Sequence, residues 1–369
     1  MPSDAAVPEW VTDPSTLHAR LAHRPARIAL DTEFIRERTY WPQLALVQIA
    51  YLDPGATQRV LLADPLSDGM ADALAPLLAD TAILKVMHSP SEDLVALRHT
   101  CGEVPRPLFD TQAAAALAGI GAGVGYQKLV EQLTGVALAK GETRSDWLRR
   151  PLSPAQLEYA ADDVRHLFDM ADALDGLLAP HGRRAWADED AVRTVALALG
   201  DTTERWPHLS MRSALFIDRA AQMRLLRLLR WRERQARSSD RPKTWILDNE
   251  LAVVLARQSP TTADALAAML DAHPKSPRKL SAAILEALHA PLDDEDEAPD
   301  ASRGDVRDKQ RLRRLQDIVA ARAATLGVPD GTLASRRWLE ALLDDGEWPA
   351  ALDGWRRGVL EAEFAAALK

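Results

Sequence analysis

The chain is poor in cysteine and in aromatic residues. Its 369 residues include one cysteine, Cys101, and only 5% of them are Phe, Trp or Tyr. A single thiol excludes an intramolecular disulfide and is typical of proteins in a reducing compartment. No catalytic histidine pattern lies beside Cys101, so we expect it to be structural rather than a nucleophile.

Long apolar runs are also missing. No uninterrupted apolar segment approaches the roughly 20 residues that are needed to cross a bilayer. The N-terminal segment MPSDAAVPEW has no basic stretch followed by an apolar core, as a secretory signal would. We therefore expect a cytoplasmic protein that has no membrane partner.

An excess of basic residues is absent from the chain as a whole, which carries a formal net charge of −9. Taken for the whole chain, this net charge disfavours a nucleic-acid partner. The charge is, however, unevenly distributed along the sequence. Residues 1–200 carry −9, residues 211–290 carry +6 and residues 291–369 carry −5. A basic module between two acidic regions can bind phosphate groups although the whole chain is acidic.

Secondary-structure patterns divide the chain into an α/β region and a helical region. RIALDTEF, QLALVQIAYL, RVLLADP and ILKVMH predict strands, a further short strand ends at FDTQ, and GMADALAPLLAD predicts a helix. After FDTQ the sequence is almost wholly helical. Strands followed by helices indicate one α/β domain and then all-α modules.

Two changes in composition mark the domain boundaries. Residues 200–210 are polar, and the acidic run DDEDEAPDAS at 293–302 lacks large apolar residues, which is typical of a flexible linker. We therefore predict four segments, which are an N-terminal domain at 1–200, a helical module at 211–290, an acidic linker at 291–304 and a second helical module at 305–369.

The candidate catalytic residues begin with two acids on the first strand of IALDTEF. Asp31 and Glu33 alternate along the strand and share one face, whereas Thr32 and Phe34 share the other. Adjacent buried carboxylates repel each other, and divalent cations are the usual compensation. A strand end with both acids in solvent is the alternative.

A third acid lies in HSPSEDL, at the start of a helix. Ser89, Pro90 and Glu92 fit a capping box, which gives Glu92 a structural role and leaves Asp93 in the first turn. From this segment alone, a helix-dipole acid is the favoured interpretation of Asp93, and a metal ligand is the alternative.

The remaining candidates lie in a later helix, whose predicted cap is Ser153 with Gln156 as its partner. Tyr159 and Asp163 are four residues apart and share a helix face. Asp162 is three residues from Tyr159, so spacing alone leaves both aspartates open.

Together these segments resemble the three motifs of the DEDD superfamily of exonucleases, in its tyrosine-bearing branch. DTEFIRERTYWPQLALVQIA, HSPSEDL, FDTQAAAAL and RSDWLRRPLSPAQLEYAADDV are similar to the bacterial ribonuclease D family, without a gap from about residue 28 to 175. Residues 211–290 resemble the helicase-and-RNase-D C-terminal (HRDC) module, and residues 305–369 resemble its more divergent second copy.

The resemblance implies the fold, the activity and the roles of the site residues. The fold would be an RNase H-like α/β exonuclease domain, with a mixed five-stranded sheet flanked by helices, followed by two all-α HRDC-type modules. The enzyme would remove nucleotides one at a time from RNA 3′ ends, including those of precursor tRNA, and release nucleoside 5′-monophosphates. The matching metal-binding acids are Asp31, Glu33, Asp93 and Asp163, and Tyr159 matches the residue that positions the attacking water.

Two divalent ions, Mg²⁺ or Mn²⁺, are the expected cofactors, because carboxylate and water ligands suit these cations better than Zn²⁺. In the two-metal scheme Asp31 bridges both ions, Glu33 and Asp163 serve the ion on the nucleophile side, and Asp93 serves the leaving side. No organic cofactor is expected, and a monomer is consistent with the sequence.

RNA is the expected partner, and eight side chains are candidate contacts. Phe34 could stack on a terminal base or belong to the core, and Arg36 and Arg38 could bind phosphates or lie in solvent. In the basic helix five arginines recur at helical spacing and predict an RNA-binding stripe. They are Arg224, Arg227, Arg230, Arg234 and Arg237. Trp231 and Trp245 are expected to be core residues of that module.

Two other functions remain open on the sequence alone. The same fold could act on single-stranded DNA, as in proofreading exonucleases, or it could be an RNA-binding protein without activity. The intact set of acids argues against the second alternative, because an inactive protein would tolerate their loss.

Overall fold

The computed structural model describes residues 7–138, 141–142, 145–200, 203–273, 275–302 and 309–368. The chain forms two compact units. The first consists of Met1–Ile35, Pro42–Asp201 and Asp308–Lys369, and the second consists of Arg36–Trp41 and Thr202–Arg307. No helix in the described ranges is both long and apolar enough to cross a membrane.

The first unit is built on a mixed sheet with the strand order β1-β4-β3-β2-β5-β6. Strands β2, β3 and β4 are antiparallel neighbours, whereas β1 pairs parallel with β4, and β5 lies parallel between β2 and β6. The strands are β1 (Glu9–Val11), β2 (Arg27–Ile35), β3 (Gln43–Leu52), β4 (Gln58–Ala63), β5 (Leu84–Met87) and β6 (Leu108–Asp110).

The five-strand count expected from the resemblance is wrong, because β1 adds a sixth strand. It is only three residues long and lies between Pro8 and the helix cap Asp13. So short a segment cannot show the alternation that predicts a strand. Its place at the sheet edge comes from pairing with β4, where Val11 lies opposite Ala63.

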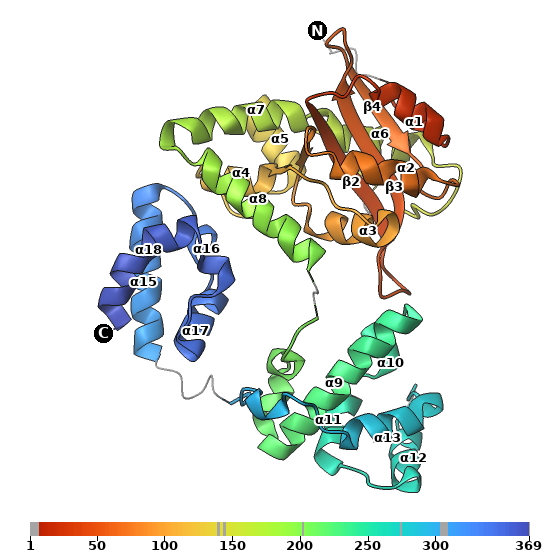
Figure 1. The fold of residues 1–369 in the computed structure, drawn as a ribbon, viewed down its shortest axis with the longest axis vertical. Helices are drawn as coiled ribbons and strands as arrows, with labels where there is room; N and C mark the ends of the chain where they lie inside the picture. The colour runs from red at the N-terminus through yellow and green to blue at the C-terminus, as the bar shows by residue number, and fades with distance from the viewer. Residues whose placement is uncertain are drawn as a thin grey trace. The chain divides into compact units, whose positions relative to one another are not determined.

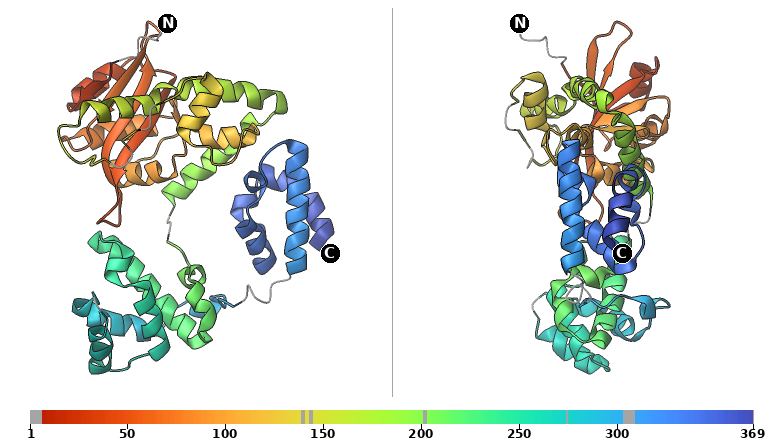
Figure 2. Two further views of the ribbon diagram at one scale, coloured as in Figure 1. Left: turned by 180° about the vertical axis from the view of Figure 1, so that it is seen from behind. Right: turned by 90° about the vertical axis from the view of Figure 1, so that its left-hand side faces the viewer.

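Helices cover both faces of this sheet (Figures 1 and 2). One face packs on α1 (Pro14–Leu21), α2 (Met70–Ala79) and α3 (Ser91–Cys101), around Leu30, Val47 and other apolar side chains. The other face packs on α4–α7, around Ala29, Leu46 and their neighbours. These helices are α4 (Thr111–Leu117), α5 (Tyr126–Thr134), α6 (Pro154–Arg165) and α7 (Leu167–Leu178).

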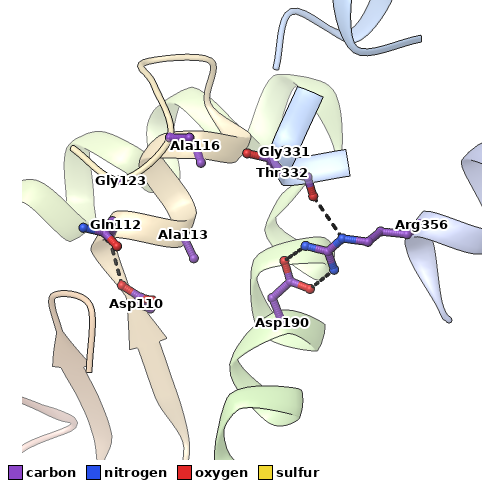
Figure 3. A pocket seen from close by; sticks show the side chains of 10 residues that line it. Asp110, Gln112, Ala113, Ala116, Gly123, Asp190, Gly331, Thr332 and Arg356 are labelled. Carbon is purple, nitrogen blue, oxygen red and sulfur yellow. Dashed lines mark hydrogen bonds and ion pairs between the residues drawn. The ribbon is translucent and has the colours of Figure 1, made fainter. Parts of the chain in front are cut away.

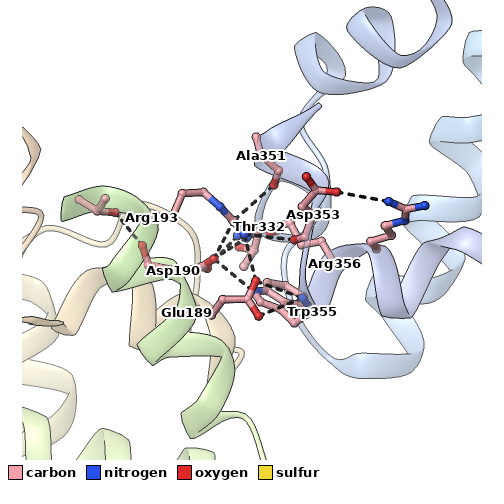
Figure 4. A network of polar contacts seen from close by, with 10 residues as sticks. Glu189, Asp190, Arg193, Thr332, Ala351, Asp353, Trp355 and Arg356 are labelled. Carbon is pink, nitrogen blue, oxygen red and sulfur yellow. Dashed lines mark hydrogen bonds and ion pairs between the residues drawn. The ribbon is translucent and has the colours of Figure 1, made fainter. Parts of the chain in front are cut away.

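The C-terminal helices belong to the first unit, where they pack beside α8 (Arg184–Leu199). They are α15 (Lys309–Leu326), α16 (Asp330–Leu333), α17 (Arg336–Asp345) and α18 (Trp355–Leu368). Trp355 stacks on Trp186 at a centroid distance of 4.4 Å. The Arg356 guanidinium donates two hydrogen bonds to the Asp190 carboxylate, at 2.5 and 2.8 Å (Figure 4).

Backbone groups extend this polar network (Figure 4). The Trp355 N–H donates to both carboxylate oxygens of Glu189 at 3.1 Å, and Arg193 donates to the carbonyl oxygens of Ala351 and Asp353. The C-terminal helices are therefore attached through charged hydrogen bonds as well as apolar packing.

The second unit is helical and has its own apolar core around Trp231, Leu251 and Ile284. The loop Arg36–Trp41 contributes Tyr40, which is buried in this core, and the backbone N–H groups of Tyr40 and Trp41 donate to Asp240 at 3.0 Å. The α-helices of this unit are α9 (Arg219–Ser239), α10 (Lys243–Ile246), α11 (Asn249–Gln258), α12 (Ala263–Asp271) and α13 (Ser281–His289).

The acidic run at 293–302, expected to be a flexible linker, packs on the second unit instead. Glu295–Glu297 forms a 3₁₀ turn, Ala298 is buried beside Leu226, and Asp294 and Glu295 form ion pairs with arginines of α9. Composition alone predicted disorder because it does not show the cations on α9 that compensate the acids. Residues 303–304 of the predicted linker lie outside the described residues.

Candidate active site

Two of the four predicted acids lie on β2. Asp31 pairs with Gln48 and Glu33 with Leu46 on the antiparallel neighbour β3, and the register shifts between Glu33 and Phe34. Strand alternation places both carboxylates on the face that packs on α6, as expected. The regular pairing of β2 with β3 therefore fixes the positions of both acids, and the irregularity begins only after Glu33.

Asp93 lies in the first turn of α3 and is 8% exposed. The Thr32 hydroxyl donates to its carboxylate at 2.5 Å, so β2 supplies a hydrogen bond to the acid from α3. From the sequence, Thr32 had no predicted role beyond the strand face to which it points. The position of its hydroxyl between Asp31 and Glu33 is the sequence feature that could have indicated a role near the acids.

The capping box predicted at the start of α3 is wrong. The helix begins at Ser91 with Pro90 as its cap residue, and no side chain in the described part of the chain caps it. Ser89 has a left-handed backbone with φ of 56°, and its N–H donates to Asp110 at 2.9 Å. The backbone turn at Ser89 therefore directs this residue toward β6 instead of the helix.

The capping box predicted for α6 is confirmed. The Ser153 hydroxyl accepts from the Gln156 N–H, and the Gln156 side chain accepts from the Ser153 N–H. The helix then places Tyr159 one turn before Asp163, whose charge raises the pKa of the Tyr159 phenol.

The structure separates Asp163 from Asp162, which spacing left open. Asp162 accepts a hydrogen bond from Arg165 at 2.5 Å, so its charge is compensated within α6. Asp163 instead lies close enough to Asp31 and Glu33 to raise the pKa of both.

Packing fixes the position of the Tyr159 ring. The ring centroid is 6.0 Å from that of the buried Trp147, and a side chain at Gly141 would overlap the Tyr159 ring. Arg150 holds the segment after Trp147 through two bonds to Asp64, at 2.7 and 2.8 Å. Tyr159 is therefore held between a buried indole and a backbone segment that only glycine allows.

The four acids share one electrostatic environment. Burial raises the pKa of Asp93 and of Asp163 to about 7 and that of Glu33 to about 9, and it raises the pKa of Asp31 well above its ordinary value. Repulsion from the other carboxylates adds to the shifts of Asp31 and Glu33. Such a site favours either protons or cations.

The acids do not yet form a chelating group. Within the described ranges, no three or more His, Cys, Asp or Glu side chains stand close enough together to hold a metal ion. Cation binding would therefore require the carboxylates to rotate toward one another. The donor set itself, which consists of oxygen atoms from four acids, suits Mg²⁺ or Mn²⁺.

The raised pKa of Glu33 predicts a pH effect on the stability of the metal-free protein. The unfolded carboxyl ionises near 4.5, whereas the folded one keeps its proton up to about 9. The folded state therefore binds more protons across this window, and its stability falls as the pH rises. In EDTA, Glu33→Gln should show a flatter decline in melting temperature than wild type between these pH values; equal slopes would contradict this assignment.

Two aromatic side chains, Tyr126 and His88, pack near the acids. The Tyr126 hydroxyl donates to the Asp162 carbonyl oxygen at 2.7 Å and so joins α5 to α6. His88 packs edge-on against Tyr126 and shares a hydrogen bond with Thr111 at 2.8 Å. Burial lowers the pKa of His88 to about 4, so a packed neutral histidine describes it best.

A cavity of about 220 Å³ lies between α4, α8 and the C-terminal helices (Figure 3). Its acids already accept hydrogen bonds: Asp110 accepts from the N–H groups of Ser89 and Gln112, and Asp190 is paired with Arg356. None of the predicted catalytic residues lines it. The candidate site is therefore the acid cluster and not this cavity.

The arginine stripe predicted on α9 is largely engaged within the second unit. Arg227 pairs with Glu295, Arg230 pairs with Asp294, and Arg237 pairs with Glu233. Arg224 donates to the carbonyl oxygen of Ala256 at 2.6 Å. The prediction of one open basic stripe is therefore wrong, because acids distant in sequence neutralise its centre. Arg234, in contrast, is exposed.

The other candidate RNA contacts differ in their surroundings. Phe34 is half-buried against the core, Arg38 is exposed, and Arg36 donates to the Tyr40 carbonyl oxygen at 3.2 Å. Of the two tryptophans expected in the core, Trp231 is buried, but Trp245 is 58% exposed. The expectation for Trp245 is therefore wrong.

Comparisons with known proteins agree with this architecture. A family model described as 3′-5′ exonuclease matches residues 8–179, and the HRDC domain model matches residues 221–288. Ribonuclease D of Xanthomonas oryzae pv. oryzae is 60% identical over 97% of each chain. The chain belongs to the ribonuclease D family.

Further ribonuclease D relatives support the same assignment. The protein of that name from Pseudomonas paraeruginosa is 38% identical over 95% of this chain and 94% of its own. The crystal structure of Escherichia coli RNase D, described as an exoribonuclease involved in structured RNA processing, matches with a TM-score of 0.81 and 27% identity, over 98% of each chain. The N-terminal domain is thus a 3′-5′ exonuclease domain of the hydrolase class, followed by an HRDC domain and further helices.

Proposed function

We propose that this chain is a 3′→5′ exoribonuclease that removes extra nucleotides from precursor tRNA and releases nucleoside 5′-monophosphates in the cytoplasm. The observation that carries the proposal is the convergence of Asp31, Glu33, Asp93 and Asp163 in one electrostatic environment, beside Tyr159. Membership of the ribonuclease D family supports RNA as the substrate.

Two divalent cations, Mg²⁺ or Mn²⁺, would be held by the four carboxylates and, when bound, would activate water and stabilise the leaving 3′-oxygen. Asp31 has the central position, since the other three acids all raise its pKa. Glu33 and Asp163 would act on the side of the attacking water, and Asp93, held by Thr32, on the side of the leaving group.

Tyr159 would orient the attacking water as a hydrogen-bond donor or acceptor, and not act as a base. Burial and the charge of Asp163 raise the pKa of its phenol, which therefore keeps its proton at neutral pH. Its packing on Trp147 restricts the orientation of the ring and therefore the direction of the hydroxyl.

Replacing Tyr159 with Phe tests this role. The ring and its packing remain, so we expect an unchanged melting temperature and unchanged Mn²⁺ affinity, with kcat lower by roughly 100-fold. Single-turnover trimming of a 3′-extended RNA gives the rate, and calorimetry gives the affinity. A variant with the wild-type rate would remove Tyr159 from the proposed chemistry.

The assay for the function itself compares substrates. The full chain is mixed with tRNA that carries a short 3′ extension and with a DNA strand of matching sequence, in Mg²⁺, in Mn²⁺ and in EDTA. We expect stepwise shortening of the RNA from its 3′ end, release of 5′-mononucleotides and no activity in EDTA. Preferred degradation of DNA would favour the alternative substrate, and no degradation would favour an RNA-binding protein.

The C-terminal helices are proposed to be a second HRDC-type module. A proline caps a four-residue helix in both places, with Pro242 before α10 and Pro329 before α16. An extended residue follows, at φ −157° and −155°, and Asp248 and Ser335 then cap helices of ten residues each, α11 and α17. The same local sequence of turns in both modules supports an internal duplication.

RNA contacts in the second unit should come from exposed cations, and two arginines of α9 provide a matched comparison. Arg227 and Glu295 are each only 15% exposed, so Arg227→Ala should lower the stability of this unit by about 2–3 kcal/mol. Arg234→Ala should leave the melting temperature unchanged but weaken RNA binding and reduce its salt dependence. Fluorescence anisotropy at several salt concentrations measures RNA binding, and thermal melts measure stability. If Arg227→Ala weakened RNA binding without lowering stability, and Arg234→Ala did not weaken binding, Arg227 would again be assigned to an RNA-binding stripe.

Phe34, Arg36 and Arg38 remain proposed RNA contacts. A half-buried aromatic ring directly after the acidic pair could stack on a terminal base, because stacking accepts any base. The exposed arginines that follow could bind the phosphates upstream of it.

A further inference from the structure

Gln48 is a fully buried polar residue on β3. Its side chain is 0% exposed, and neither the carboxamide oxygen nor the nitrogen has a hydrogen-bond partner among the described residues. Each unsatisfied buried group costs about 1–3 kcal/mol. An apolar side chain of similar size would avoid this cost, so the amide calls for a functional explanation.

The register of the sheet places Gln48 beside the acid cluster. Gln48 on β3 lies directly opposite Asp31 on β2. Side chains of directly opposed residues in an antiparallel pair share one face, with Cβ atoms roughly 5 Å apart. The Gln48 carboxamide and the Asp31 carboxylate therefore project together from the sheet.

The neighbours on this face confirm that direction. Leu46 and Ala50, two residues either side of Gln48 on β3, belong to the core cluster that also contains Ala160 and Ala161 of α6. The alternate residues Val47 and Ile49 belong to the cluster on the opposite face. Gln48 thus lies between the sheet and α6, the helix that carries Tyr159 and Asp163.

We propose that Gln48 is a positioning residue for Asp31: when a cation is bound and the carboxylate is ionised, the Gln48 carboxamide N–H donates to it the hydrogen bond that is missing in the described structure. Carboxylates that hold metal ions need a further hydrogen bond to fix their orientation, and losing that bond typically costs 10- to 100-fold in metal affinity, by rough estimate. Asp31 is the acid assigned to both ions, so fixing its plane would organise the whole site. This inference rests on the proposed metal-dependent function.

Replacing Gln48 with Met is the principal test, because Met keeps the length of the side chain and removes both polar atoms. The metal-free melting temperature should stay the same or rise, since no unsatisfied amide remains. The dissociation constant for Mn²⁺, measured by calorimetry on the full chain, should increase about 10- to 100-fold. Excess Mn²⁺ should restore most of the trimming rate.

Leu46→Met is the matched control, since Leu46 lies on the same face of β3, opposite Glu33. It changes packing without changing hydrogen bonding, so its Mn²⁺ affinity should remain within about twofold of wild type. A metal-free melting temperature that falls equally in both variants, with unchanged Mn²⁺ affinity, would show that Gln48 is only a packing residue and overturn the inference.

A measurement on the wild-type chain keeps the proposal testable if Gln48→Met does not fold. Mg²⁺ addition should shift the NMR signals of the Gln48 side-chain amide and slow its hydrogen exchange. The inference would be overturned if the Gln48 amide signals stayed unchanged while backbone signals around Asp31 shifted. It would also be overturned if NMR showed that the Gln48 carboxamide is hydrogen-bonded to the indole N–H of Trp147, which also lacks a partner in the described structure. If the wild-type chain bound neither Mg²⁺ nor Mn²⁺, the proposed metal-dependent function would fail. If it bound them without any effect on the Gln48 amide, only the inference about Gln48 would fail.

Discussion

Asp31→Asn is expected to lower exonuclease activity by about 1,000-fold or more, which corresponds to ~4 kcal/mol of transition-state stabilisation. Asn keeps the shape of the side chain and removes the charge. Because Asp31 lies at the centre of the acid cluster, where the other three acids all raise its pKa, its loss should affect every cation held there. Single-turnover trimming of a 3′-extended RNA measures the effect.

The same substitution should make the metal-free protein more stable. The wild-type carboxyl is buried among like charges, so replacing it with a neutral amide removes repulsion in the folded state only. Asp162→Asn is the control, because Asp162 is paired with Arg165 and should keep nearly full activity. An active Asp31→Asn variant, or an inactive Asp162→Asn variant, would reverse the assignment of the metal-binding acids.

Arg356→Ala is expected to destabilise the attachment of the C-terminal helices by about 3 kcal/mol. The Arg356 and Asp190 side chains are only 7% and 14% exposed, so removing the cation leaves a carboxylate with little access to water. The Asp190 side chain keeps bonds from Trp355 and Arg193, which limits the loss. Urea unfolding followed by tryptophan fluorescence reports it directly, because Trp186 and Trp355 stack at this contact.

Arg357→Ala provides the matched control one residue away. Arg357 is 45% exposed and pairs with Glu361 on its own helix, so its removal should leave the free energy of unfolding nearly unchanged. Equal destabilisation by both substitutions would mean that the Asp190–Arg356 pair does not hold the C-terminal helices. Replacing both Asp190 and Arg356 with apolar residues should recover much of the lost stability.

The parts of the site that the sequence predicted depend on local rules. The α6 capping box needs only Ser153, Pro154 and Gln156 in order, and these residues fix where the helix begins. Strand alternation likewise places Asp31 and Glu33 on one face. Ser89 shows the limit of such rules. It begins the same cap pattern, but it adopts a left-handed backbone conformation and its N–H donates a hydrogen bond to the side chain of Asp110, 21 residues away.

The parts that the sequence missed depend on contacts between distant segments. Spacing shows that the arginines of α9 share a face, but it cannot show that Asp294 and Glu295 fold back onto that face. The role of Thr32 depends on where α3 meets β2, and the position of Gln48 depends on strand register. Strand β1 was missed because three residues carry too little pattern.

Calorimetric titration of the full metal-free chain with Mn²⁺, in buffers of different ionisation enthalpy, measures whether the four acids bind cations in exchange for protons. Asp31, Glu33, Asp93 and Asp163 all have raised pKa values, so cation binding must displace protons from them. We expect two Mn²⁺ ions to bind per chain with proton release at pH 7, and we expect Asp31→Asn to lose both the binding and the proton release. Binding without proton release, or unchanged binding in Asp31→Asn, would contradict this expectation.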